Sequence, residues 1–154
     1  MTEQVQNQFN IQKIYLKDSS FESPESPASF TFEKWEPKVD LNMNNTNNKL
    51  NDVSFEVVLS LTATVKNEDK TAFLVEVQQA GIFAIQGVEE ADVSYLLGSQ
   101  CMTILFPYAR EAISDLVTKG GFPPLLLNPV NFDALYMQHI EQQKKASEES
   151  EVKH

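Results

Sequence analysis

The chain has 154 residues, 42% of them hydrophobic, and 22 acidic residues outnumber 12 basic ones to give a formal charge of −10. This length suits one domain whose core needs no disulfide or metal, and the composition excludes a disordered or fibrous protein. The negative charge argues against binding to nucleic acid or to an anionic membrane, because both are bound through Lys and Arg. A partner with a basic surface fits the charge better, although acidity also simply keeps a protein in solution.

The start of the chain, MTEQVQNQFNIQKIY, has neither the basic residues nor the apolar stretch of a secretion signal, so a cytoplasmic protein is expected. No segment approaches the roughly 18 apolar residues of a membrane span, so no membrane insertion is expected. The single cysteine, Cys101, cannot close an intrachain disulfide, which agrees with a reducing compartment. We expect it to be a small buried side chain rather than a reactive thiol.

Two short strands are expected near the start, after a disordered segment over residues 1–8. Residues 9–18 alternate weakly between apolar and polar side chains, and residues 39–44 alternate without a break. This alternation is typical of strands with one solvated face. The Asn-rich segment 42–51 is expected to form a turn.

The clearest strand covers residues 53–66, where every odd position is apolar and every even position except Val58 is polar. After the polar residues 67–70 the alternation resumes over residues 71–85, which predicts a long antiparallel hairpin. Gly81 inside the second strand indicates a bulge or a close approach of the backbone. Together with the two shorter strands, this hairpin predicts a four-stranded antiparallel sheet.

The second half of the chain has apolar residues at helical spacing. A long helix is expected over residues 89–119, and Pro107 is expected to break or kink it near its middle. Asn131 is expected to cap a shorter C-terminal helix, and residues 143–154 to form a flexible polar tail. The predicted fold class is therefore α+β, with residues 9–142 forming a single domain.

The sequence contains no arrangement of residues that indicates catalysis. The adjacent Gly120 and Gly121 precede Phe122 and two prolines, so they do not form a phosphate-binding loop. The only histidines are His139 and His154, and His139 is interpreted as a surface or half-buried residue of the last helix. No enzyme activity, cofactor or metal site is expected.

The segment between the first two strands, residues 19–38, is too long for a hairpin turn and carries four large aromatic side chains. These are Phe21, Phe30, Phe32 and Trp35. Either the loop folds back over the sheet or a helix, or its aromatic residues form the wall of an apolar groove. Residues 125–127 and the apolar face of the last helix raise the same question, since oligomerisation or a binding surface would absorb the apolar surplus.

Four segments resemble, in the same order, the SecB family of bacterial protein-export chaperones. They are IYLKD with SFESP (residues 14–18 and 20–24), FLVEVQQAGIF (73–83), LFPYARE (105–111) and PVNFDALY (129–136). The resemblance covers residues 9–142, and its one noted departure is Ala80, where the family often has a second Gly beside Gly81.

The resemblance implies an α+β protomer that assembles into a homotetramer, a dimer of dimers with the long helices packed between the pairs. It also implies a chaperone that works without ATP. Such a holdase binds unfolded precursor proteins in apolar grooves, keeps them competent for translocation and delivers them to the export ATPase SecA. No cofactor is implied.

Carried over by position, the resemblance implies two surfaces. The residues implied for client binding are Phe30, Phe32, Trp35, Val39, Leu41, Met43, Ile82, Phe83, Phe132, Leu135 and Tyr136. The residues implied for contact with SecA are Asp18, Glu22, Leu74 and Glu76. An acidic docking face also agrees with residues 50–95, where eight acidic residues stand against Lys66 and Lys70.

Two other functions stay open on the sequence alone. A SecB-like fold can serve a toxin–antitoxin module or another client system instead of export, since a fold does not fix the partner. A carrier of a small apolar ligand would use the same groove, with a defined pocket filled by one ligand per protomer.

Overall fold

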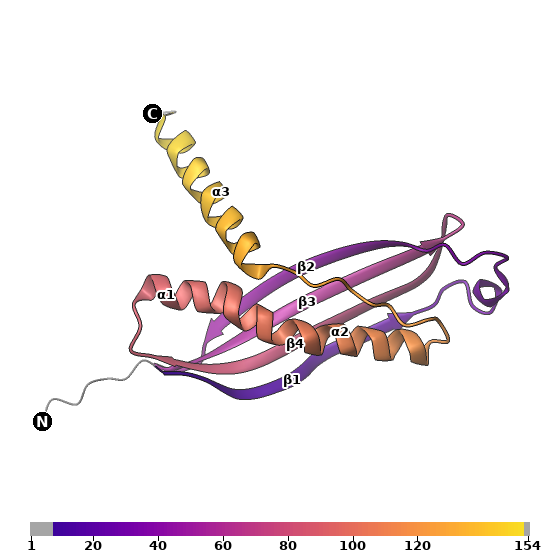
Figure 1. The fold of residues 1–154 in the computed structure, drawn as a ribbon, viewed down its shortest axis with the longest axis horizontal. Helices are drawn as coiled ribbons and strands as arrows, with labels where there is room; N and C mark the ends of the chain where they lie inside the picture. Colours follow the sequence, from indigo (N-terminus) through magenta and orange to yellow (C-terminus); the bar gives the residue numbers. More distant parts are fainter. Residues whose placement is uncertain (1–7, 153–154) are drawn as a thin grey trace, which may run out of the picture.

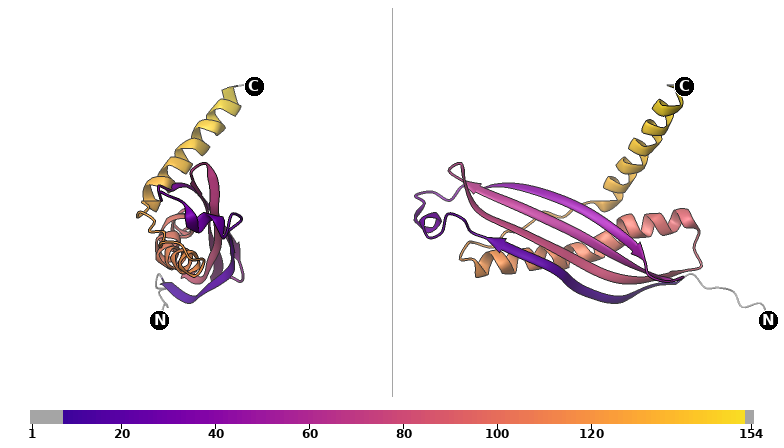
Figure 2. Two further views of the ribbon diagram at one scale, coloured as in Figure 1. Left: turned by 90° about the vertical axis from the view of Figure 1, so that its right-hand side faces the viewer. Right: turned by 180° about the vertical axis from the view of Figure 1, so that it is seen from behind.

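The computed structural model describes the backbone of residues 8–152, so the disorder expected for residues 1–8 falls almost entirely outside the described residues. Four antiparallel strands form one sheet: β1 (Gln8–Glu22), β2 (Lys38–Lys49), β3 (Ser54–Asn67) and β4 (Lys70–Gln86). The strand order is β1-β4-β3-β2, which places β1 and β2 at the two edges. The helical segment over residues 90–119 lies along one face of this sheet, and the last helix leads away from it (Figures 1 and 2). The predicted four-stranded antiparallel sheet is confirmed.

The β3–β4 hairpin forms because its alternating residues place one apolar row on the helix face. Val57, Leu59 and Leu61 are buried there, while the intervening side chains point to the opposite face, which we call the open face. The strands are joined by Glu68 and Asp69, which have φ angles of 54° and 64°. Such a two-residue turn follows the right-handed twist of the strands and sets the register beside it. The register then shifts between Val65 and Lys66 and is regular along the rest of the hairpin.

The weak alternation of β1 has a structural cause. The pairing of β1 with β4 shifts register between Ile11 and Lys13 and again between Leu16 and Asp18. Each irregularity moves the strand by one residue, so the side chains that face the helices fall out of a simple period of two. Phe21, near the end of the strand, is thereby returned to the helix face opposite Val75.

Strand β2 is longer than the sequence predicts. The turn expected over residues 42–51 is wrong for most of that range, because β2 continues to Lys49 and pairs with β3 along its length. Asn side chains are tolerated there because β2 is an edge strand, and they are exposed. The turn begins afterwards, where Asn51 Oδ1 accepts hydrogen bonds from the amides of Val53 and Ser54 at 3.0 and 2.9 Å.

A helical segment interrupted by a π-helical turn packs on the sheet. It consists of α1 (Glu90–Tyr95), the π-helical turn η2 (Leu96–Gln100) and α2 (Cys101–Lys119). The predicted break at Pro107 is wrong, because Pro107 lies inside α2. Proline has no amide hydrogen, so the carbonyl of Thr103, four residues before Pro107, lacks its usual partner in the helix. Both residues are exposed, so water can bind this carbonyl oxygen.

The core lies between α2 and the helix face of the sheet. It includes Cys101, which is buried as predicted, and burial raises the pKa of its thiol to about 12. At Gly81 the structure shows a close approach rather than a bulge, since a Cβ there would lie 2.7 Å from Phe83 Cε2 and 3.2 Å from Leu105 Cδ2. Within the described part of the chain, none of the helices combines the length and the apolar character needed to span a membrane.

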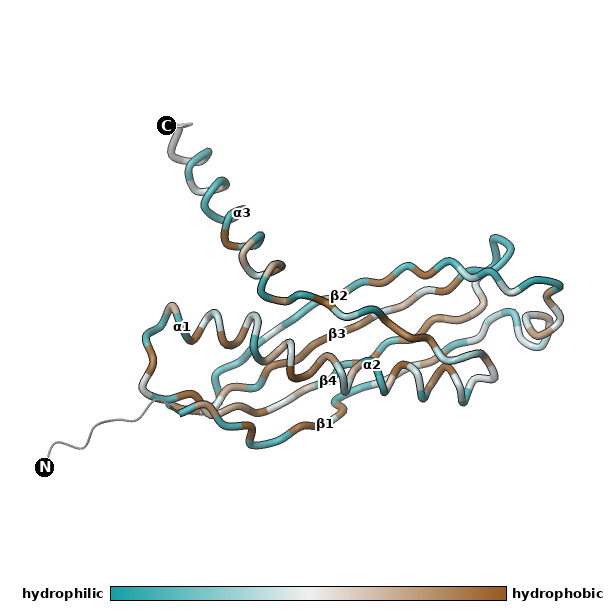
Figure 3. The backbone as a smooth tube through the Cα atoms, in the orientation of Figure 1, coloured by the Kyte–Doolittle hydropathy of each residue, from teal (hydrophilic) through white to brown (hydrophobic). Residues whose placement is uncertain are grey.

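The last helix, α3 (Phe132–Val152), projects away from the sheet (Figure 1). The sequence interpretation ended this helix near Gln142 and expected a polar tail without regular structure over residues 143–154; the structure corrects that, since the helix continues to Val152. The outer half is hydrophilic all round (Figure 3), and its Lys, Ala and Glu residues are strong helix formers, so local propensity favours the helical conformation there. The last two residues lie outside the described part.

Candidate functional site

A cavity of about 540 Å3 lies where β2, the turn η2 and helix α3 meet, and we call it the β2–α3 groove. Its floor is apolar, with Leu59, Leu97 and Met102 buried beneath it. Asparagine side chains of β2 form one rim and α3 forms the other. The full lining is Met43, Asn44, Asn45, Asn47, Leu59, Ser94, Leu97, Gly98, Met102, Phe132, Leu135, Tyr136 and His139.

Strand register explains the β2 wall. Met43 pairs with Leu61, and Leu41 and Val39 pair with Ala63 and Val65, so all three β2 residues lie on the helix face. Val39 and Met43 remain exposed on this edge strand, and Leu41 is half-buried. Of these three predicted residues only Met43 reaches the lining of the groove, while the other two extend the same apolar strip along β2.

The α3 wall depends on a helix cap. The amide of Ala134 donates to Asn131 Oδ1 at 3.0 Å, which confirms Asn131 as the predicted cap and fixes where α3 begins. Leu135 and Tyr136, two of the residues implied for client binding, then line the groove. Phe132 also lines it but is buried, with its ring edge-on to Phe106 at 5.7 Å between centroids, so it anchors the helix more than it offers surface.

The aromatic loop packs around one residue, Phe122. The ring centroids of Phe30 and Trp35 lie 5.1 and 5.7 Å from that of Phe122, which itself lies 4.8 Å from that of Phe73 in the core. Phe30 and Trp35 still expose 52% and 37% of their surface. The loop therefore packs over Phe122, as the first interpretation expects, and Phe30 and Trp35 leave an apolar surface outside; their role as the wall of a client groove stays a prediction. Sequence reasoning missed Phe122, whose only signal was its place in the apolar segment FPPLLL.

Asn67 holds the aromatic loop against the β3–β4 hairpin. Its Oδ1 accepts a hydrogen bond from the amide of Glu36 at 2.9 Å, and its Nδ2 donates to the carbonyl of Lys34 at 2.9 Å. Asn67 is buried, so these bonds replace hydration that it would otherwise lose. They also set the position of Trp35, which lies between the two bonded residues.

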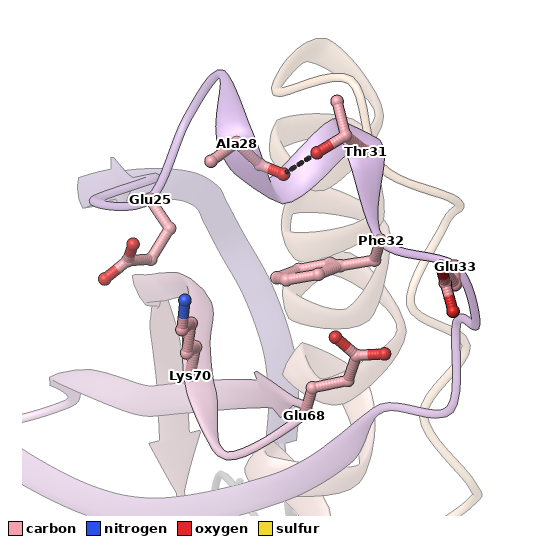
Figure 4. Close-up of a pocket in the computed structure, with 7 residues that line it drawn as sticks. All are labelled: Glu25, Ala28, Thr31, Phe32, Glu33, Glu68 and Lys70. Atoms are coloured by element: carbon pink, nitrogen blue, oxygen red, sulfur yellow. Dashed lines mark hydrogen bonds between the residues drawn. The ribbon is translucent and has the colours of Figure 1, made fainter.

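Phe32 lies apart from the β2–α3 groove. It is half-buried and lines a separate cavity of about 300 Å3, shown in Figure 4. The other residues around this cavity are Glu25, Ala28, Thr31, Glu33, Glu68 and Lys70. Its polar and charged surroundings do not resemble the apolar floor of the groove.

Two of the residues implied for client binding lie away from the β2–α3 groove. Phe83 is fully buried in the core, where its ring stacks on Phe9 at 5.8 Å, so it lines no surface there. Ile82 points to the open face, between Lys13 of β1 and Glu56 of β3. Both residues were carried over by position from the family resemblance, but adjacent residues of a strand face opposite sides of a sheet, so one face cannot present both.

The four residues predicted to contact SecA do lie together. Glu22 of β1 pairs with Leu74 of β4 on the open face. The next two pairs on the same face are Ser20 with Glu76 and Asp18 with Gln78, so all four predicted residues lie in three neighbouring rows. Across the sheet, Leu74 also pairs with Thr64, and Thr64 with Asp40 of β2. The open face thus carries a half-buried leucine among carboxylates that come from three strands.

Most of the eight acidic residues within residues 50–95 lie away from the open face. Glu76 and Glu56 are the only two of them on the open face; the others lie in turns or at the start of the helical segment, as the strand and helix bounds show. Glu56 is already paired, since Lys17 Nζ lies 2.9 Å from its Oε1 and the Tyr15 hydroxyl donates to its Oε2. The hydrogen bonds from Tyr15 and, second, from Lys17 lower the pKa of Glu56. Burial and, second, the hydrogen bond to Glu56 raise the pKa of Tyr15 to about 12.

The chain is similar to known proteins in sequence and in fold. The sequence matches the family described as SecB, preprotein translocase subunit SecB, over residues 2–143. It is 61% identical to the protein-export protein SecB of Methylococcus capsulatus, over 90% of this chain and 89% of that protein. It is 57% identical to the protein-export protein SecB of Nitrosococcus oceani, over 97% of this chain and 91% of that protein.

The fold is also similar to a solved structure, a SecB-like chaperone of Mycobacterium tuberculosis in complex with a peptide from the HigA1 antitoxin. The TM-score is 0.65 at 20% identity, and the match covers 79% of this chain and 90% of that one. At this identity the likeness concerns the fold. The family match over almost the whole chain and the two export-protein relatives together show that the chain belongs to the SecB family of protein-export chaperones.

Proposed function

We propose that the protein is a holdase that works without ATP: it binds unfolded precursor proteins, keeps them competent for translocation and delivers them to SecA. The observation that carries this proposal is the β2–α3 groove, whose buried apolar floor is bordered by amide side chains. An extended client would place apolar side chains on the floor and offer its backbone to the asparagines. Membership of the SecB family supports the same function.

The groove suits a client that has no fixed sequence. Methionine is flexible and polarisable, and Met43 and Met102 contribute to the lining, so the surface can adapt to different apolar side chains. The exposed parts of Phe30 and Trp35 extend apolar contact to the far end of the sheet. Weak contacts at several such places add through effective concentration, which gives tight holding with fast local release.

The open face is the surface we propose for SecA. Asp18, Glu22 and Glu76 surround Leu74 there, so charge would steer a basic partner and the leucine would supply apolar contact. The client groove lies on the other side of the sheet. A precursor and SecA could therefore be bound by one protomer at the same time.

A homotetramer, formed as a dimer of dimers in the cytoplasm, completes the proposal. Large apolar side chains are exposed at Ile11 and Leu16 of the edge strand β1 and at Tyr108 of α2. Burying such patches between copies of the chain would remove them from water. Export precursors are made in the cytoplasm, where a holdase must meet them.

A role with toxin–antitoxin clients is the second candidate, because the solved SecB-like chaperone was bound to an antitoxin peptide. The relatives named for protein export are much more similar to this chain, at 57–61% identity against 20%. Export is therefore the function that we favour.

The proposal is tested with purified protein and a reduced, unfolded secretory precursor. We expect the protein to slow refolding and prevent aggregation without ATP, and native mass measurement to show a tetramer that gains one client. The same complex should bind purified SecA. A protein that neither delays refolding nor prevents aggregation would exclude the holdase function, and client binding without SecA binding would favour the toxin–antitoxin role.

A further inference from the structure

Helix α3 is attached to the rest of the protein by few residues. Phe132 is buried and Tyr136 and Ile140 are half-buried, whereas every side chain over residues 141–150 is exposed. Figure 2 shows the helix leaning out from the body with only its first turns near α1 and η2. The β2 wall of the groove is fixed by a full ladder of strand pairs, so α3 is the wall that can move.

One carboxylate ties this wall to the turn η2. Asp133 Oδ1 accepts a hydrogen bond from the Tyr95 hydroxyl at 2.7 Å and a second from the hydroxyl of Ser99, which is fully buried. Gln100 Nε2 donates to the Tyr95 oxygen at 3.3 Å and so helps to orient it. The bonds from Ser99 and Tyr95, in that order, hold the pKa of Asp133 below its usual value, so the carboxylate is ionised at neutral pH.

This contact lies where α1 passes into the π-helical turn, since Tyr95 is the last residue of α1 and Ser99 belongs to η2. Tyr136 packs directly on the backbone of η2, since a Cβ at Gly98 would lie 2.7 Å from Tyr136 Cδ2. The Tyr136 ring also meets that of Tyr95 edge-on, with centroids 5.6 Å apart. The end of α1 and the turn η2 thus present the Tyr95 phenol, the Ser99 hydroxyl and the bare backbone at Gly98 to α3, and π-helical turns are frequent at functional sites.

We propose that Asp133 is a positioning residue that holds α3 against η2 and thereby sets the width of the β2–α3 groove. This inference rests on the proposed function, because the groove matters only if clients enter it. The tie consists of two hydroxyl donors on one charged acceptor, which is stronger than a neutral bond yet can be replaced by water. Release of the tie would let α3 swing outward on the connector that precedes Asn131, and the groove would lose one wall.

The test measures the position of α3 directly, without a client. Spin labels are attached at Asn48→Cys on β2 and Gln142→Cys on α3, both exposed and outside the groove lining. The native Cys101 is fully buried, with its thiol pKa raised to about 12, so it does not compete for the label. We expect Asp133→Ala to lengthen and broaden the label–label distance, Asp133→Asn to give an intermediate result, and the exposed control Glu141→Ala to leave it unchanged.

The second readout is the release of a reduced and alkylated, permanently unfolded polypeptide. We expect Asp133→Ala to speed its dissociation about five- to tenfold, because a preorganised wall is lost. An unchanged distance in Asp133→Ala, or an equal change in Glu141→Ala, would overturn the inference. If Asp133→Ala does not fold, Tyr95→Phe and Ser99→Ala each remove one donor and must each move the distance in the same direction.

The two readouts separate this inference from the proposed function. Should the unaltered protein fail to bind any unfolded polypeptide, the holdase proposal would be lost, while the distance measurement would still decide the role of Asp133. Should clients bind normally and the distance stay fixed in every variant, the function would stand and the positioning role would be excluded.

Discussion

The indole of Trp35 stacks on the ring of Phe122, with centroids 5.7 Å apart and planes inclined by 29°. Phe122 is buried and packs on Phe73 of the core, whereas the outer side of Trp35 faces solvent. One side chain therefore joins the core to an exposed apolar surface. Its removal should affect both the stability of the fold and the binding of clients, in proportions that can be measured.

Replacing Trp35 with alanine should weaken client binding by about 1–2 kcal/mol, as truncation of an aromatic contact residue commonly does. Unfolding free energy should fall by about 1 kcal/mol, because Phe122 loses a stacking partner. Client affinity by fluorescence anisotropy and stability by urea denaturation measure the two effects. Leu126→Ala is the matched control, since Leu126 is a largely exposed apolar residue of the connector. Lower stability with unchanged affinity would show that the loop only covers the core.

Reversing the charge of Glu76 separates the two proposed surfaces. Glu76→Lys should weaken binding to SecA about tenfold, because a like charge now opposes the basic partner, and should leave client holding unchanged. Affinity for SecA is measured at two salt concentrations, since screening should reduce the difference between the variant and the unaltered protein. Glu90→Lys makes the same charge change at the start of α1 and serves as the control. Equal loss of both activities in Glu76→Lys would contradict the division of surfaces.

The sheet could be predicted from the sequence where alternation is strict, as in β3 and β4, because a period of two specifies which face is buried. The two edge strands were predicted but too short: in β1 two register shifts displace the period, and in β2 exposed Asn residues imitate a turn. The π-helical turn has no local signal. Gly98 is its only unusual residue, and a Cβ there would lie 2.7 Å from Tyr136 Cδ2.

The candidate site was predictable in part for the same reason. Positions carried over from the family placed the open-face residues together, since Asp18, Glu22 and Glu76 sit in neighbouring rows. Phe83 was expected to bind clients but is buried in the core, because successive side chains of a strand point to opposite faces of the sheet and Phe83 is on the helix face. Phe122 and Asp133 act through contacts with residues distant in sequence, and such contacts leave no spacing pattern to recognise.

The pKa of Glu56 predicts a dependence of stability on pH. Its pKa is lowered in the folded protein by hydrogen bonds from Tyr15 and then Lys17. The pair therefore stabilises the fold above the carboxyl pKa of the unfolded chain, and this contribution is lost as pH falls through the lowered value. Because Lys17 is nearly half exposed, we expect less than about 1 kcal/mol.

Glu56→Gln should accordingly reduce stability at neutral pH and match the unaltered protein more closely near about pH 3. Urea unfolding across this range measures the difference. Glu90→Gln removes an exposed carboxylate elsewhere and is the control. A difference between Glu56→Gln and the unaltered protein that stays constant with pH would exclude ionic pairing as its cause.

Gly81 offers a test of packing in the core. A Cβ at this position would lie 2.7 Å from Phe83 Cε2 and 3.2 Å from Leu105 Cδ2, and both neighbours are fully buried. Gly81→Ala should therefore lower the unfolding free energy by about 1–3 kcal/mol through overpacking. Strand propensity alone predicts the opposite sign, a gain of about 0.5–1 kcal/mol, because glycine loses more conformational entropy on folding than alanine.

A double mutant separates the two causes. Leu105→Ala removes the Cδ2 atom that the new methyl group would crowd, so Gly81→Ala should be less destabilising in that background than alone. Urea denaturation of the four proteins gives the coupling energy, and Gln86→Ala at the exposed end of β4 controls for a general effect of substitution in this strand. Additive effects would mean that Leu105 does not limit the space at Gly81. A stabilising Gly81→Ala would show that strand propensity outweighs crowding in this core.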